Sequence, residues 1–243
     1  MRRFAAALWL LLLAAGCIAP PEARCPTCRV FDRRHPELPE LDPGAERLFI
    51  IVPGLLGYGW EWDQPMARLR AAPHVATLVF WWDPFGSVDR GARDLAALLD
   101  KLQEGGPPAL REIVVVAHSG GGLVAAHALG YIAPPTRHLT LATIGAPFAG
   151  MHICPWGEED ILHAPLMFTV AARYRRYPDP PANTEVIEYV TSFPSDPVMH
   201  PYWNRSAAPP DIGPAGARRI DVDPKLDHNV VVDHVVVELL ARR

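Results

Sequence analysis

Short apolar runs alternate with helical patterns along most of this 243-residue chain. Each run is followed by turn residues, and its continuous apolarity predicts a strand that is covered on both faces. Strands alternating with helices favour an α/β fold with a mostly parallel central sheet and helices on both faces. The predicted strands are residues 47–52, 75–82, 113–117, 139–144, 185–191 and 217–222, and the predicted helices are residues 90–103, 120–132 and 230–240.

The same patterns divide the chain into a leader, a tether and a domain. We expect a signal peptide at residues 1–16, a tether rich in proline and charge at residues 17–45, and one folded domain at residues 46–243. Within that domain, residues 148–182 interrupt the alternation with an acidic patch and a proline-rich end. Insertions of this kind between strands often cover a site, so a lid-like insertion is predicted there.

The first residues place Arg2 and Arg3 before about a dozen apolar residues, which is the layout of a secretory signal peptide. The run closes with Ala14-Ala15-Gly16-Cys17, which resembles the lipobox of bacterial lipoproteins, with alanine where leucine is commoner. The resemblance implies a lipid on Cys17 and a membrane-anchored lipoprotein of the bacterial cell envelope. A secreted or periplasmic protein is the alternative.

Three further cysteines, Cys25, Cys28 and Cys154, would then lie in an oxidising compartment, where disulfides persist. The spacing of Cys25 and Cys28 favours a local disulfide, and pairing of one tether cysteine with Cys154 is the alternative. A zinc site is disfavoured because no matching second pair of ligands follows.

Residues 113–122 combine a predicted strand, a serine among small residues and the start of a predicted helix. A strand-to-helix turn this tight strains the serine backbone and requires small residues two positions before and after it. Ala117 and Gly121 meet that requirement around Ser119. A phosphate-binding turn is the alternative, but the lysine and the spaced glycines of the nucleotide-binding motifs are absent.

The run Ala117-His118-Ser119-Gly120-Gly121 resembles the G-x-S-x-G pattern of the α/β-hydrolase family, in its lipase and esterase branch, with Ala117 in place of the first glycine. The resemblance covers about residues 46–240 and implies the α/β-hydrolase fold with Ser119 as nucleophile. Residues 53–57 follow the first core strand, where the family places its oxyanion loop. By this resemblance, the backbone N–H groups of Leu55 and Gly120 are the oxyanion donors. A plain glycine-rich turn is the alternative for that loop.

The family's chain order is serine, acid, histidine. Asp196 follows the strand at residues 185–191, and His228 stands between the last strand and the closing helix. The resemblance implies that His228 takes the Ser119 proton and that Asp196 fixes its tautomer. Asp211 and the acidic patch at residues 158–160 are rival acids. Among the other histidines, His118 is expected to be structural and His234 to be a surface or packing residue. His200 follows Asp196 too closely to be its distant partner.

These residues predict a serine hydrolase that cleaves carboxylic esters of small molecules or lipids. Aromatic residues flank the predicted site and could line an acyl pocket, or they could be ordinary packing; they are Tyr58, Trp60, Trp62, Trp81 and Trp82. The alternatives are an acyltransferase or thioesterase on the same fold, and a non-catalytic binding lipoprotein of the envelope. The chemistry needs no cofactor or metal, and a net charge of −4 disfavours a nucleic-acid partner. The oligomeric state is left open.

Overall fold

A seven-stranded sheet runs through the molecule in the order β1-β3-β2-β4-β5-β6-β7, and every pairing is parallel. This computed structural model describes residues 28–32, 36–54, 59–83, 87–148, 177–190, 213–223, 225–226 and 230–242. The strands are β1 (Val30–Phe31), β2 (Arg47–Val52), β3 (Val75–Phe80), β4 (Glu112–His118), β5 (His138–Ile144), β6 (Thr184–Val190) and β7 (Arg218–Asp221).

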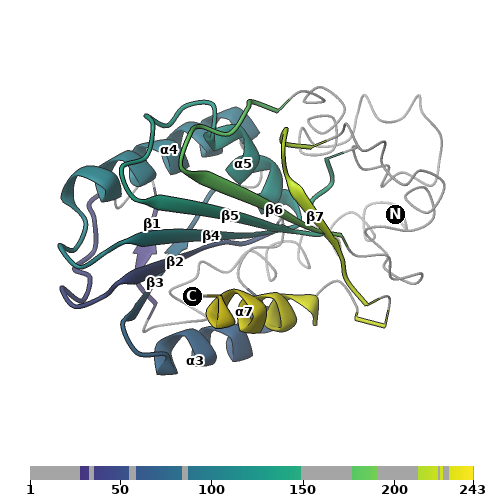
Figure 1. Cartoon of the computed structure of the whole chain (residues 1–243), viewed down its shortest axis with the longest axis horizontal. Coiled ribbons are helices and arrows are strands. Elements are labelled where there is room, and N and C mark those ends of the chain that lie inside the picture. Colours follow the sequence, from purple (N-terminus) through teal and green to yellow (C-terminus); the bar gives the residue numbers. More distant parts are fainter. Residues whose placement is uncertain are drawn as a thin grey trace, which may run out of the picture.

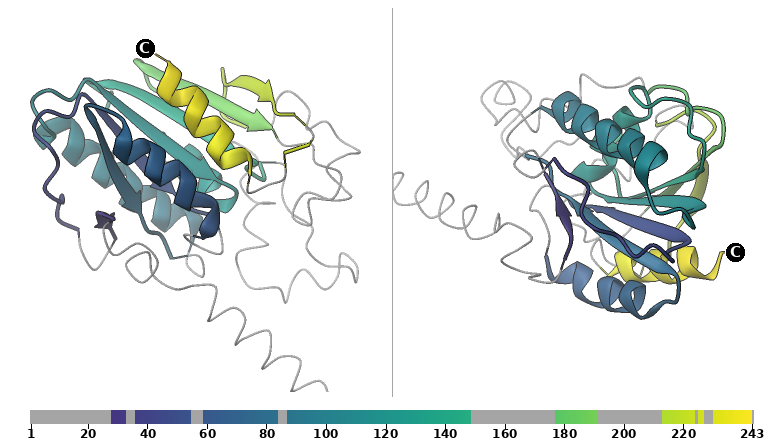
Figure 2. Two further views of the ribbon diagram at one scale, coloured as in Figure 1. Left: turned by 90° about the horizontal axis from the view of Figure 1, so that it is seen from below. Right: turned by 90° about the vertical axis from the view of Figure 1, so that its left-hand side faces the viewer.

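Helices cover both faces of the sheet (Figures 1 and 2). Helices α4 (Val88–Gly105) and α5 (Gly120–Ala128) pack together on one face. Helices α3 (Asp63–Ala71) and α7 (Val231–Ala241) pack together on the other, next to the short helix η1 (Trp60–Trp62). The fold is therefore the three-layered α/β arrangement that the alternating pattern predicts.

The central strands are apolar throughout because both of their faces are buried. In β4, Ile113 and Val115 belong to the core beneath α4 and α5, whereas Val114 and Val116 belong to the core beneath α3 and α7. Successive side chains of a strand point to opposite faces, so a strand between two helical layers needs apolar residues at every position. This requirement explains why continuous apolarity located the strands so well.

The predicted strands and helices are present, with ends displaced by a few residues. The largest displacement is at α5, which ends at Ala128 rather than residue 132. Among the described residues, three elements were not predicted: the short helix η1, helix α3 and strand β1. Helix α3 has a weak apolar pattern and carries Pro65 in its first turn, where proline is tolerated. Strand β1 has only two residues and lies within the predicted tether.

Residues 28–32 lie along the edge of the sheet. The Arg29 carbonyl accepts a hydrogen bond from the N–H of Val79 at 2.9 Å, and the Phe31 carbonyl accepts one from Trp81 at 2.9 Å. Cys28 is disulfide-bonded, and its Sγ accepts a hydrogen bond from Arg70 at 3.0 Å. The other cysteines of the chain, Cys17, Cys25 and Cys154, lie outside the described residues. In the part of the chain that the structure describes, no helix has the length and apolarity to cross a bilayer.

Candidate active site

The carboxyl ends of all strands meet at one edge of the sheet, since every pairing is parallel (Figure 1). Strand β4, the fourth of the seven in spatial order, ends at His118, and α5 begins at Gly120. Ser119 therefore stands alone between strand and helix at the centre of this edge. In open parallel sheets, ligands bind outside the carboxyl ends of the strands.

The backbone of Ser119 is strained, as the tight turn predicts. Its φ of 51° and ψ of −125° fall in a region that residues with a Cβ rarely adopt, at a cost of about 1–3 kcal/mol. Two hydrogen bonds hold the turn: the Ser119 N–H donates to the Ile144 carbonyl at 2.8 Å, and the Ser119 carbonyl accepts from Gly122 at 2.9 Å. The Ser119 side chain makes no capping hydrogen bond with the first turn of α5, all of which the structure describes. Unlike most serines before a helix, Ser119 therefore does not use its hydroxyl as a cap.

Backbone from β2 lies directly against the start of α5. A Cβ added to Gly121 would lie 2.5 Å from the carbonyl oxygens of both Val52 and Pro53, which is too close for any side chain. A Cβ added to Gly122 would lie 2.4 Å from the side-chain Cβ of Ala146. Glycine is therefore required at Gly121 by a close approach of backbone, which is the role that the motif assigned to it.

The predicted oxyanion loop begins beside the serine. A Cβ added to Gly54 would lie 3.0 Å from the Cβ of Ser119, so the backbone after β2 passes right next to the candidate nucleophile. Gly120, one of the predicted donors, is the first residue of α5. The first N–H groups of a helix have no acceptor within it and favour a negative charge. Leu55, the other predicted donor, lies outside the described residues.

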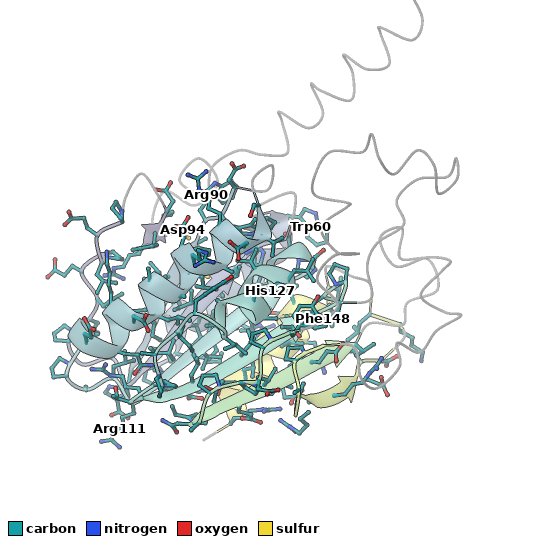
Figure 3. The ribbon with its side chains drawn as sticks, turned by 90° about the horizontal axis from the view of Figure 1, so that it is seen from above. Trp60, Arg90, Asp94, Arg111, His127 and Phe148 are labelled. Atoms are coloured by element: carbon teal, nitrogen blue, oxygen red, sulfur yellow. The ribbon has the colours of Figure 1, made fainter. Side chains whose placement is uncertain are left out.

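The aromatic residues near this edge have different roles. Trp62 is fully buried and its ring lies 6.3 Å from that of buried His118, in an edge-to-face arrangement. Trp82 is buried too, and Trp81 is half-buried against the core beneath α3 and α7. For these residues ordinary packing, the alternative raised from sequence, describes what is seen. Trp60 differs, since it is 61% exposed and lies toward the carboxyl edge (Figure 3), and Tyr58 lies outside the described residues.

The predicted acid and base, Asp196 and His228, both lie outside the described residues, as do the rival acids at residues 158–160 and 211. Their neighbours in the chain are described. Strand β6 ends at Val190, six residues before Asp196, and α7 begins at Val231, three residues after His228. His234, within α7, is exposed.

The two residues that bracket residues 149–176 of the predicted insertion contact each other. The rings of Phe148 and Tyr177 lie 4.8 Å apart in an edge-to-face arrangement, and His127 of α5 lies 4.9 Å from Tyr177. Figure 3 shows Phe148 and His127 on the face that α4 and α5 cover. Burial lowers the pKa of His127 and raises the pKa of Tyr177. The base of the insertion is thus held together by a buried aromatic cluster.

The half-buried carboxylate of Glu188 lies near enough to this cluster to act electrostatically on Tyr177. Burial raises the pKa of Glu188, against the opposing effect of Arg219. No group of three or more His, Cys, Asp or Glu side chains in the described part of the chain could hold a metal ion.

Comparison with known proteins agrees with the geometry of the turn. A profile described as "Alpha/beta hydrolase family" matches residues 49–238. The chain belongs to the alpha/beta hydrolase family. The match takes in most of β2, the Ser119 turn and most of α7.

The individual proteins that this chain resembles have low sequence identity to it. The rice (Oryza sativa subsp. japonica) protein "Esterase PIR7B" is 30% identical over 129 residues, which are 49% of this chain and 47% of that protein. The chain thus matches about half the length of this curated relative. The lipase BlEst2 of Bacillus licheniformis, in its mature form, is a similar structure, with a TM-score of 0.56, 18% identity and coverage of 84% of this chain and 95% of that one. The RedJ thioesterase of Streptomyces coelicolor gives a TM-score of 0.50 at 16% identity, covering 82% and 87%. At these identities the similar structures establish the fold.

Two of the contacts that the sequence did not predict involve the first residues of the predicted oxyanion loop. The first is the approach of Gly54 to Ser119, and the second is a hydrogen bond of 2.9 Å from the indole Nε1 of Trp82 to the carbonyl of Pro53. The signal for the second was present, since Trp82 ends one predicted strand and Pro53 follows another. Only the spatial order of the strands makes them neighbours, because β3 pairs directly with β2.

Proposed function

We propose that the protein is a serine hydrolase that cleaves carboxylic esters through an acyl-enzyme on Ser119. The observation that carries this proposal is the state of Ser119 itself. It is a residue with a Cβ held in strained backbone, at the carboxyl edge of a parallel sheet, with its hydroxyl not used as a helix cap. Strain of about 1–3 kcal/mol at a single residue persists only where surrounding structure enforces it, and such residues cluster at active sites.

The proposed reaction has two halves. The Ser119 oxygen attacks the ester carbonyl carbon while His228 takes its proton, and the resulting oxyanion is stabilised by the N–H groups of Leu55 and Gly120. The C–O bond to the alcohol then breaks, and the alcohol leaves with the proton from His228. Water attacks the acyl-enzyme by the same steps and releases the acid and free Ser119. Asp196 holds the imidazole in the required tautomer.

The family and the partial similarity to an esterase support the ester as substrate class. The position of Gly120 as the first residue of α5 supports its role as oxyanion donor, since its N–H has no acceptor within the helix. The roles of Leu55, Asp196 and His228 are carried by chain order alone.

The test is hydrolysis of p-nitrophenyl esters, from acetate to palmitate, by the purified domain and by Ser119→Ala. Turnover that disappears in the variant supports the proposal, and the preferred chain length separates an esterase from a lipase. Faster cleavage of acyl thioesters, or transfer of the acyl group to an added alcohol, would instead identify a thioesterase or acyltransferase. No turnover of any of these substrates would favour a binding protein of the envelope.

The proposed mechanism also requires neutral His228. We expect the rate to fall as the pH drops through about 6.5, the ordinary pKa of histidine. A rate that stays constant between pH 5 and 8 would contradict the assignment of a histidine base.

We further propose that Cys17 carries a lipid that anchors the protein to the bacterial envelope. The support is the sequence of residues 1–17, two arginines, an apolar run and small residues before the cysteine. Metabolic labelling with an alkyne fatty acid is expected to mark the wild type and not Cys17→Ser. Labelling that persists in the variant, or an unlabelled wild type, would contradict the anchor.

A further inference from the structure

The carbonyl of Pro53 makes two close contacts at the carboxyl edge. Trp82, only 7% exposed, donates its indole N–H to this oxygen at 2.9 Å. Gly121 approaches the same oxygen so closely that an added Cβ would lie 2.5 Å away. The peptide that joins Pro53 to Gly54 is therefore held by a donor that follows β3 and by the first turn of α5.

This peptide leads directly to the proposed oxyanion donor. Gly54 lies against Ser119, with only 3.0 Å between an added Cβ and the serine Cβ, and Leu55 comes next in the chain. Glycine has wide freedom in φ and ψ, so Gly54 by itself does not define where the following N–H points. An anchor on the preceding carbonyl fixes the peptide plane from which those two torsions start, and so fixes where Gly54 lies against Ser119.

We propose that Trp82 is a positioning residue for the oxyanion hole. Its indole N–H orients the peptide between Pro53 and Gly54 and so holds the start of the proposed oxyanion loop against Ser119. The inference rests on the proposed function, since it assumes that an oxyanion forms beside Ser119. Any buried indole N–H needs an acceptor. Here the acceptor is the carbonyl that comes directly before Gly54, the residue in contact with Ser119.

The sharpest variant replaces Trp82 with 3-benzothienylalanine, in which sulfur takes the place of the N–H and the ring shape is kept. Trp82→Phe is the simpler companion, and it removes the donor together with part of the ring. Tyr189→Phe is the matched control, because it deletes a buried aromatic hydroxyl, contacted by Arg242 at 3.3 Å, in a strand on the other side of β4.

We expect the benzothienyl variant to lower kcat for a p-nitrophenyl ester by about tenfold with little change in KM, because a displaced donor weakens binding of the transition state more than that of the substrate. The inhibition constant of a trifluoromethyl ketone, whose adduct places an oxyanion in the same hole, should rise by the same factor. Tyr189→Phe should change neither quantity.

A purely structural role predicts a different result. The melting temperature of the benzothienyl variant would fall while kcat and the inhibition constant stay at wild-type values, and that outcome would overturn the inference and leave the proposed function intact. A wild type that neither turns over esters nor binds the ketone would overturn the proposed function, and this inference with it. If Trp82→Phe does not fold, the 3-benzothienylalanine variant, which keeps the ring shape, still tests the positioning role.

Discussion

Two serines of this protein stand at the start of neighbouring helices, and they differ in nearly every respect. Ser87, before α4, has ordinary extended backbone with φ of −88°, and its side chain accepts a hydrogen bond of 3.2 Å from the N–H of Arg90. Ser119, before α5, has φ of 51° and makes no such bond. Serine is favoured before a helix because it caps the first turn. Ser87 therefore stabilises its helix, whereas Ser119 holds a strained position at a cost that the surrounding core must offset.

The largest difference between these serines should appear in catalysis. Ser119→Ala is expected to lower kcat/KM for p-nitrophenyl esters by about 10⁴-fold or more, because loss of a nucleophile removes the covalent route. Ser87→Ala should keep wild-type kcat/KM. Steady-state kinetics of the two purified variants checks this, and comparable losses in both would remove the distinction between the two helix starts.

The next largest expected effect is a loss of folding stability when the packing around the Ser119 turn is disturbed. Gly121→Ala would push a methyl group against two backbone carbonyls that cannot move aside, and it should destabilise the fold by about 2–4 kcal/mol. Gly105→Ala is the matched control, since Gly105 ends α4 and has nothing within 4 Å of an added Cβ. That variant should be neutral or slightly stabilising. Urea denaturation measures both, and a Gly121→Ala protein as stable as wild type would show that the turn is not held by this contact.

The Ser119 turn was predictable from sequence because its determinants are local. A buried strand, two small residues flanking the serine and a glycine-rich helix start all lie within ten residues, and each leaves a mark in the sequence. The Trp82 to Pro53 hydrogen bond was not predictable, because it depends on β3 lying next to β2 in space. Helix α3 escaped notice because only three of its side chains are buried. Asp196 and His228 were assigned from chain order, and they remain predictions.

Removing the two serine side chains should change the stability of the fold by smaller amounts and in opposite directions. Ser119→Gly should raise the free energy of unfolding by about 1 kcal/mol, because glycine adopts a positive φ without strain. Ser87→Ala should lower it by about 1 kcal/mol through loss of the cap. Urea denaturation of the two variants tests the contrast. A loss of stability in both would mean that Ser119 stabilises its helix after all.

The smallest expected effect is the dependence of stability on pH. It arises from titratable groups between the first turn of α4 and the end of α5. Tyr131 donates a hydrogen bond to Asp89 there, and Arg93 contacts the same carboxylate at 3.1 Å, which together lower the pKa of Asp89. His127 lies nearby, and burial lowers its pKa although Asp89 opposes the shift. As the pH falls below about 6.5, the unfolded chain takes up a proton at His127 before the folded protein does, so stability should decrease.

His127→Gln should reduce that loss of stability, because it removes the group that titrates differently in the two states. Urea midpoints at pH 7.5 and 5.5 provide the measurement. A midpoint difference that is identical in wild type and variant would show that another group causes the acid sensitivity.

The central claim is that Ser119, and not an ordinary serine such as Ser87, is chemically activated. The most direct measurement is reaction of the wild-type protein with a fluorophosphonate, followed by peptide mass spectrometry to locate the adduct. We predict a single phosphonyl group on Ser119, with Ser87 unmodified. No adduct should form on protein that is denatured before the reagent is added, or on Ser119→Ala. A wild-type protein that takes no label, or takes it equally at Ser87, would contradict the claim.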